Sequence, residues 1–226
     1  MLYFIDIETI PNQTIDPALE PVFDPSEVKV GNIKDPEKIN AKIADEKWKF
    51  EKELDKEMSL DGALFQVVAF GYAIVNPRTL EVEREDVVYG AKSDAAILAF
   101  VENLFGGESD GEDKIVTWNG KRFDLPQLQR RGWVKGKRIF PRFYYPEIVN
   151  PYQDKKSLDL KYVWHPEGKD SLEKCALALG IPSPKTTLDG SKVFTAWKEG
   201  KEREICDYCQ GDVRTMIEVY RRIVHV

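Results

Sequence analysis

The stretch Leu2–Ile10 reads LYFIDIETI and places two acidic side chains, Asp6 and Glu8, inside a mostly apolar segment. Its Ile, Phe and Tyr content is typical of a β-strand. Side chains two residues apart on a strand point to the same face, so the two acids are expected to lie side by side. Burying two like charges costs free energy unless a counter-charge is present. The segment predicts either a divalent-cation site or an edge strand with one solvated face.

The composition is that of a soluble globular protein, and the 226 residues fit one large domain spanning 1–226. The net charge of -6 argues against a broad DNA-coating surface, but not against an enzyme whose acids hold metal ions. No segment approaches the ~18 apolar residues of a membrane span, and the N-terminus does not resemble a signal peptide. The cysteines Cys175, Cys206 and Cys209 form no disulfide framework, which favours a reducing cytoplasm.

Strand and helix patterns alternate along the rest of the chain and predict an α/β domain around a mixed sheet. A helical insertion is expected at about 35–58, where Asp35 and Pro36 suit the start of a helix. It could be a solvated amphipathic helix laid over the domain, or a clamp over a bound nucleic-acid strand. Further strands are expected within 63–77, 81–90 and 114–118, and further helices within 93–105, 171–182 and 201–224.

Two more acidic residues, Asp124 and Asp212, lie after an expected strand and within an expected helix, respectively. Asp124 comes shortly after the strand expected at 114–118, close to Asn119 and next to Phe123. Strand ends of this kind are where open α/β sheets place their chemistry, although Asp124 could instead be a helix N-cap. In the last expected helix Tyr208 and Asp212 are four residues apart, so they share one face.

Taken in order, Asp-x-Glu, Asn-x-x-x-Phe-Asp and Tyr-x-x-x-Asp resemble the three motifs of the DEDD 3′–5′ exonuclease superfamily. The tyrosine form (DEDDy) is similar to the proofreading domains of family B DNA polymerases, and the chain resembles the stand-alone PolB-like exonucleases of prokaryotes and their phages. The sister branch has His five residues before the last acid, where this chain has Asp207. The resemblance implies a ribonuclease H-like fold with a mixed five-stranded sheet flanked by helices.

The resemblance also implies roles for individual residues. Two Mg²⁺ or Mn²⁺ ions would be held by Asp6, Glu8, Asp124 and Asp212, and Tyr208 would orient the attacking water. Such an enzyme would hydrolyse the terminal phosphodiester of single-stranded or frayed DNA at its 3′ end and release nucleoside 5′-monophosphates. It would work in the cytoplasm of a prokaryotic or phage-infected cell, and its partner could be a polymerase or another replication or repair protein.

Substrate contacts are expected from basic and aromatic residues near Asp124. Residues 127–145 combine six positive charges with interleaved aromatic rings and contain no acid, a pattern that favours phosphates and unpaired bases. The alternative is that the rings belong to the core and the charges only solubilise a loop. The candidate substrate-binding residues are Asn119, Lys121, Arg122, Phe123, Arg130 and Arg131.

Two alternative functions stay open at this point, and two further residue patterns are set aside. The same acids could serve an exoribonuclease, because the site cleaves either backbone and discrimination would come from pocket contacts. The chain could also be a catalytically silent nucleic-acid-binding module of the same fold. Cys206 and Cys209 form Cys-x-x-Cys, but no second Cys/His pair completes a zinc site. Asp159 is expected to be a local capping residue rather than a further acid of the site.

Overall fold

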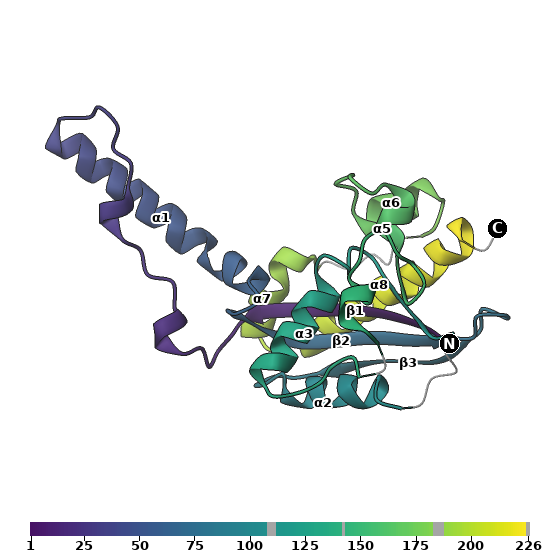
Figure 1. Cartoon of the computed structure of the whole chain (residues 1–226). Helices are drawn as coiled ribbons and strands as arrows, with labels where there is room; N and C mark the ends of the chain where they lie inside the picture. Colours follow the sequence, from purple (N-terminus) through teal and green to yellow (C-terminus); the bar gives the residue numbers. More distant parts are fainter. Residues whose placement is uncertain (108–111, 142, 183–187, 225–226) are drawn as a thin grey trace.

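The computed structural model describes residues 1–107, 112–141, 143–182 and 188–224. At its centre is a five-stranded sheet with the order β3-β2-β1-β4-β5 (Figure 1). β1 is antiparallel to β2, which is antiparallel to β3, whereas β4 and β5 continue the sheet in parallel with β1. The mixed five-stranded sheet expected from the sequence is therefore confirmed. The strands are β1 (Leu2–Pro11), β2 (Phe65–Val75), β3 (Val82–Tyr89), β4 (Lys114–Thr117) and β5 (Ser157–Asp159).

Helices flank this sheet on both faces, and each expected helix is found within a few residues of its predicted place. The longer ones are α1 (Pro36–Leu60), α2 (Ala95–Leu104), α3 (Asp124–Val134) and α8 (Glu202–Ile223). The shorter ones are α4 (Tyr145–Ile148), α5 (Leu160–Trp164), α6 (Leu172–Ala178) and α7 (Val193–Lys198), with 3₁₀ turns at Pro17–Leu19, Pro25–Glu27 and Gly190–Lys192. No helix in the described ranges combines the length and the apolar character that a membrane crossing requires.

The alternation of side chains along β1 divides the core into two layers. Tyr3, Ile5 and Ile7 pack into the layer that contains residues of α2 and α3. Leu2 and Phe4 pack into the opposite layer, which contains residues of α6 and α8. Each such buried side chain stabilises the fold by about 1.5–3 kcal/mol. Because the period of a strand is two residues, this alternation directs the side chains of even-numbered residues toward the face that α8 covers.

β1 and β2 are adjacent antiparallel strands, yet a long excursion containing α1 connects them. α1 and the chain before it project away from the sheet, and the C-terminal end of α1 returns to the body beside α7 (Figure 1). The carboxylate of Asp35 accepts a hydrogen bond from the Glu37 amide at 3.0 Å, so the predicted helix start is confirmed. The residue of α1 that is buried, Met58, lies near the C-terminal end. α1 is thus a solvated helix, but it does not lie over the domain.

Candidate active site

The position of Asp124 depends on the unequal lengths of β1 and β4, two parallel strands. β4 pairs with β1 only from Leu2 to Phe4, so beyond Phe4 no strand of the described residues pairs with this edge of β1. The chain leaves β4, turns, and begins α3 at Asp124, whose carboxylate accepts a hydrogen bond from the backbone amide of Ile7 at 3.1 Å. Asp124 is therefore in the first helical turn rather than at the N-cap, which is Phe123. The carboxylate satisfies a strand donor that would otherwise be buried without a partner.

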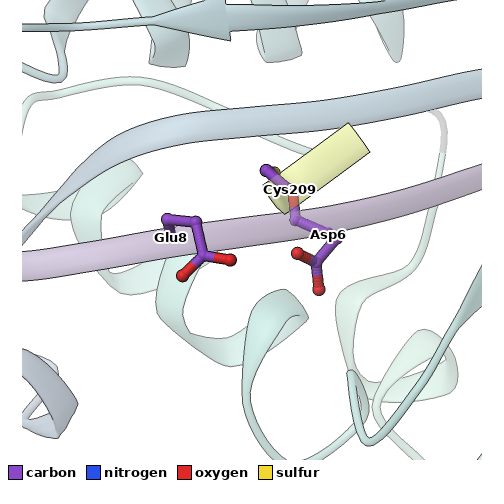
Figure 2. Close-up of side chains that lie close together, drawn as sticks. All are labelled: Asp6, Glu8 and Cys209. Carbon is purple, nitrogen blue, oxygen red and sulfur yellow. The ribbon is translucent and has the colours of Figure 1, made fainter. Parts of the chain in front are cut away.

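Asp6 and Glu8 lie next to one another along β1, as their spacing predicts. Figure 2 shows both carboxylates on the same side of the strand. Asp6 pairs with Gly71 of β2, Glu8 pairs with Ala69, and the register shifts directly after Glu8. A bulge at this place re-aims the following side chains, and bulges are frequent next to functional sites. Glu8 is buried, while Asp6 keeps part of its surface exposed.

α8 brings the remaining acid to the sheet, and a glycine allows the helix to come close. A Cβ atom at Gly71 would lie 2.8 Å from Sγ of Cys209 and 3.1 Å from Cγ2 of Val213, so this close approach requires glycine. One turn of α8 then presents Tyr208 and Asp212 to the same region, where each side chain acts on the other electrostatically. The predicted one-face arrangement of these two residues is found in the structure.

The four carboxyl groups influence one another electrostatically. Burial raises the pKa of Asp6 well above its ordinary value, and the charges of Asp124, Glu8 and Asp212 raise it further. Burial raises the pKa of Glu8 in the same way, with contributions from Asp212 and Asp124. Burial is also the main reason why the pKa of Asp124 rises to about 7 and that of Asp212 to about 6. In the described part of the chain, none of these carboxylates forms an ion pair with Lys or Arg.

This donor set fits a divalent cation. Carboxylate oxygens are the ligands that Mg²⁺ and Mn²⁺ prefer, and buried like charges without a positive partner are relieved by such an ion. One oxygen each of Asp6 and Glu8 and the sulfur of Cys209 lie within 4.8 Å of one another. Asp124 and Asp212 lie outside that tight group among the described residues, but their charges act on it.

Cys209 belongs to this region, which sequence reasoning did not anticipate. Its thiol donates to the backbone carbonyl of Asp6 at 3.7 Å (Figure 2). Burial and the neighbouring carboxylates raise the pKa of Cys209 well above its ordinary value, so the sulfur stays protonated and is a poor ligand for a hard cation. Its partner in the Cys-x-x-Cys motif, Cys206, is half-buried. The signal that could have placed Cys209 here is its position between Tyr208 and Asp212 on α8.

The turn between β4 and α3 is held by Asp159, as a capping residue. Its carboxylate accepts hydrogen bonds from the backbone amides of Asn119 at 2.8 Å, Lys121 at 3.2 Å and Lys161 at 3.1 Å. Asn119 has φ +65°, a left-handed conformation that asparagine tolerates better than most residues. Its side-chain oxygen accepts a hydrogen bond from Nζ of Lys161 at 3.3 Å. Asn119 thus shapes the turn that delivers Asp124.

For two residues, Arg131 and Lys121, the prediction of phosphate binding is wrong, because both side chains are buried. Arg131 is 1% exposed, and its guanidinium donates to the Asp94 carboxylate at 2.6 Å and lies over the ring of Phe65. Lys121 is also buried, and its Nζ donates to the backbone carbonyl of Gln153. Both positive charges are used inside the fold and are not available to a phosphate in solvent.

Other predicted substrate residues remain accessible. Arg122 is exposed, and its Nε donates to the hydroxyl of Tyr162 at 2.9 Å. Arg130 is exposed on α3, and Phe123 is half-buried next to Asp124. In the segment 127–145 the core interpretation holds for Phe140 and Phe143, which are buried. Arg142 of this segment lies outside the described residues.

Known proteins resemble the chain in sequence and in fold. The sequence signature of a family described as a predicted 3′–5′ exonuclease related to the exonuclease domain of PolB matches residues 60–226. That region contains α3 and α8 with Asp124, Tyr208 and Asp212, whereas β1 precedes it. Among proteins with curated functions, no sequence matches the chain.

Solved structures share the fold at low sequence identity. The family B DNA polymerase of the archaeon Pyrobaculum calidifontis superposes with a TM-score of 0.53 and 17% identity, covering 99% of this chain and 24% of the polymerase. E. coli Exonuclease I in complex with a dA16 oligonucleotide superposes with a TM-score of 0.50 and 13% identity, covering 99% of this chain and 41% of the enzyme. The zinc-bound form of the E. coli ExoI–ssDNA complex superposes with a TM-score of 0.50 and 14% identity, covering 98% of this chain and 40% of the ExoI chain.

The chain thus spans less than half the length of each of these structures, and the shared feature is their ribonuclease H-like exonuclease fold. The acids of β1, α3 and α8 meet at one place in that fold, and the family signature extends over most of the chain. The chain belongs to the family of predicted 3′–5′ exonucleases related to the exonuclease domain of PolB.

Proposed function

We propose that the chain is a metal-dependent 3′–5′ exonuclease that removes nucleoside 5′-monophosphates from single-stranded or frayed DNA ends. The observation that carries this proposal is the group of four carboxyl groups from β1, α3 and α8: burial raises the pKa of all four, and repulsion within the group adds to the rise at Asp6, Glu8 and Asp124. A fold maintains such a repulsive cluster at a cost in stability, which is reasonable where function requires bound cations.

Asp6, Glu8, Asp124 and Asp212 would hold a pair of Mg²⁺ or Mn²⁺ ions. When bound, the ions would supply the activation of the attacking water and the neutralisation of charge on the departing 3′-oxygen. The chain's own part is to keep four oxygen donors in place: β1 fixes two, the Ile7 amide orients Asp124, and Tyr208 orients Asp212. The zinc-bound form of E. coli ExoI, which has this fold, is consistent with a divalent cation here.

Tyr208 would position the attacking water with its hydroxyl group. Burial and the charges of Glu8, Asp212 and Asp6 raise the pKa of Tyr208 far above its ordinary value, so the phenol remains protonated. A neutral hydroxyl keeps a lone pair with which it can accept a hydrogen bond from water. Tyr208 is therefore a positioning group rather than a general base.

The substrate end would be held by the accessible residues around Asp124. Phe123 can stack on a terminal base, while Arg122 and Arg130 offer positive charge to the phosphates. E. coli Exonuclease I, which shares the fold, was solved with single-stranded oligonucleotides, and this supports single-stranded DNA as the substrate. Action beside a polymerase or a repair protein is part of the same proposal.

The test uses oligonucleotides labelled at either end. With Mg²⁺ or Mn²⁺, the wild type should shorten a 5′-labelled strand stepwise and release the label of a 3′-labelled strand as a mononucleotide, and EDTA should stop both. Asp6→Asn and Asp212→Asn should each lower kcat by about 100-fold or more. Asp207→Asn is the matched control, because Asp207 is an exposed acid of α8 that pairs with Arg203.

Each alternative has its own outcome in this experiment. Faster degradation of RNA than of DNA would favour an exoribonuclease. Tight binding without degradation in either metal would favour a silent binding module. Release of the label from the 5′ end first would refute the proposed polarity.

A further inference from the structure

A cavity of about 400 Å³ lies directly beside the carboxylate cluster. β1, α1, α7 and the residue before α3 contribute to its lining, which includes Glu8, Phe123, Phe194, Leu60, Lys52 and Lys56. A volume of this order suits a small organic group such as one nucleotide. The cavity therefore joins the candidate active site to the last turns of α1, the helix whose role the sequence left open.

The end of α1 is fixed to the body of the molecule by several independent contacts. The Thr9 hydroxyl donates to the backbone carbonyl of Ser59 at 2.7 Å. The side-chain amide of Gln127 donates to the carbonyl of Leu60, also at 2.7 Å. Nζ of Lys198 on α7 lies 3.4 Å from the carboxylate of Asp55. These contacts connect α1 to β1, α3 and α7, so the wall that α1 gives the cavity is a fixed part of the fold.

The charges around the cavity are arranged unevenly. Glu8 of β1 and Asp55 of α1 are the acids that line it, and Phe123, Phe194 and Leu60 provide apolar surface. Lys52 and Lys56 are exposed and four residues apart, so they lie on one face of α1. Within the described residues neither lysine takes part in an ion pair, and Nζ of Lys52 lies over the ring of Trp48. A carboxylate that can hold a cation, an apolar wall and two ammonium groups outside the described ion pairs together match a nucleotide with its phosphates.

We infer that Lys52 and Lys56 bind the phosphates of the last nucleotides of a strand whose 3′ end enters this cavity. α1 would then be a wall of the subsite for the terminal nucleotide, supplied by a segment that lies before or at the edge of the matched region 60–226. This inference rests on the proposed exonuclease function and adds a substrate-binding element to it. It also gives the excursion between β1 and β2 a task at the active site.

The test compares two pairs of alanine substitutions on the same helix. K52A/K56A removes the cavity lysines, and K38A/K47A removes two exposed lysines of α1 that do not line the cavity. Affinity for a fluorescent single-stranded oligonucleotide is measured against salt concentration with Ca²⁺, a hard cation that seeks oxygen ligands. KM and kcat are measured with Mg²⁺, and thermal unfolding shows whether each variant is folded.

For K52A/K56A we expect weaker binding, a higher KM with little change in kcat, and a salt slope smaller by about 1.4, since each phosphate contact to a single strand contributes about 0.7. K38A/K47A should behave as the wild type. K52R/K56R should restore affinity, because the charge is retained.

Equal losses in both alanine pairs would overturn the inference, since the effect would then come from the general charge of α1. Unchanged KM and salt slope in K52A/K56A would overturn it as well, while cleavage by the wild type would leave the proposed function in place. If the wild type cleaves nothing, the proposed function fails, and the binding series alone still decides whether these lysines contact the strand.

Discussion

At the scale of single residues, the hydroxyl of Tyr208 is the most specific feature of the site. Tyr208→Phe removes the hydroxyl that interacts with Asp212 and that is proposed to position water. We expect kcat to fall by about 100-fold with little change in KM, because the lost interaction matters mainly in the transition state. Steady-state kinetics on a single-stranded oligonucleotide measure both constants.

The matched control for this substitution is Tyr220→Phe. Tyr220 lies on the same helix, eight residues beyond Asp212, with its ring 5.4 Å from that of Phe4 in the core. It should keep wild-type kcat. A rise in KM with unchanged kcat in Tyr208→Phe would instead indicate that the hydroxyl binds substrate.

Gly71 controls how closely α8 approaches the sheet. In Gly71→Ala the new Cβ would meet Cys209 and Val213, so α8 has to move outward and carry Asp212 with it. We expect the free energy of unfolding to fall by about 1–3 kcal/mol and metal affinity to fall as well. Denaturant unfolding and Mn²⁺ titration measure the two effects.

Gly107→Ala serves as the control for the change of residue type, because a Cβ atom there has nothing within 4 Å. It should leave both quantities close to those of the wild type. Wild-type stability and metal affinity in Gly71→Ala would show that α8 tolerates the extra methyl group, and the close approach would lose its explanation.

At the scale of elements, a buried ion pair links α3 to the start of α2. Arg131→Met leaves the Asp94 carboxylate buried without its partner. We expect a loss of about 3–5 kcal/mol in the free energy of unfolding, with KM unchanged for the protein that remains folded. Arg130→Met, a change at the exposed neighbour, should leave stability nearly intact. If Arg131→Met raised KM without loss of stability, Arg131 would have to be returned to the substrate-binding residues.

The elements also show what the sequence could and could not predict. The two-residue spacing of Asp6 and Glu8 and the four-residue spacing of Tyr208 and Asp212 depend only on strand and helix geometry, so their shared faces were predictable. Arg130 and Arg131 look alike in a basic run, because the burial of one depends on Asp94, a distant residue of another element. Local periodicity carries no information about such a partner.

The same reasoning explains the other differences. α1 was predictable as a helix from its Asp-Pro start and amphipathic pattern, but its projection from the body follows from contacts at its C-terminal end. The Cys-x-x-Cys motif raises only the question of a zinc site for Cys209, whereas the position of Cys209 depends on the approach of α8 to Gly71. In each case the missing information concerned how separate elements pack.

At the scale of the whole molecule, the acid cluster should make stability depend on pH and metal together. Without metal, Asp124 and Asp212 have pKa values of about 7 and about 6, whereas the unfolded chain has ordinary carboxyl groups near pKa 4. The folded state therefore binds protons more tightly, and this contribution to stability is present at low pH and is lost as pH rises through about 6 to 7.

We expect Mg²⁺ to raise the melting temperature more at about pH 8 than at about pH 5, because at the higher pH the carboxylates are ionised and repel one another. Scanning calorimetry at each pH gives the melting temperature with Mg²⁺ and with EDTA. Groups far from the site titrate equally in both samples, so their effect cancels when the two melting temperatures are subtracted. Asp124→Asn should reduce the pH dependence. A metal-induced shift that is the same at every pH would mean that these groups are ionised in the metal-free fold.

The acids of the site come from β1, α3 and α8, elements that are far apart in the chain. α8 is synthesised after the other two, and its docking completes the set. A partly folded copy in which α8 has not docked thus lacks the complete donor set. Under the proposed function, a copy of this kind would be unable to cleave nucleic acid, because its acids are dispersed over elements that have not yet met.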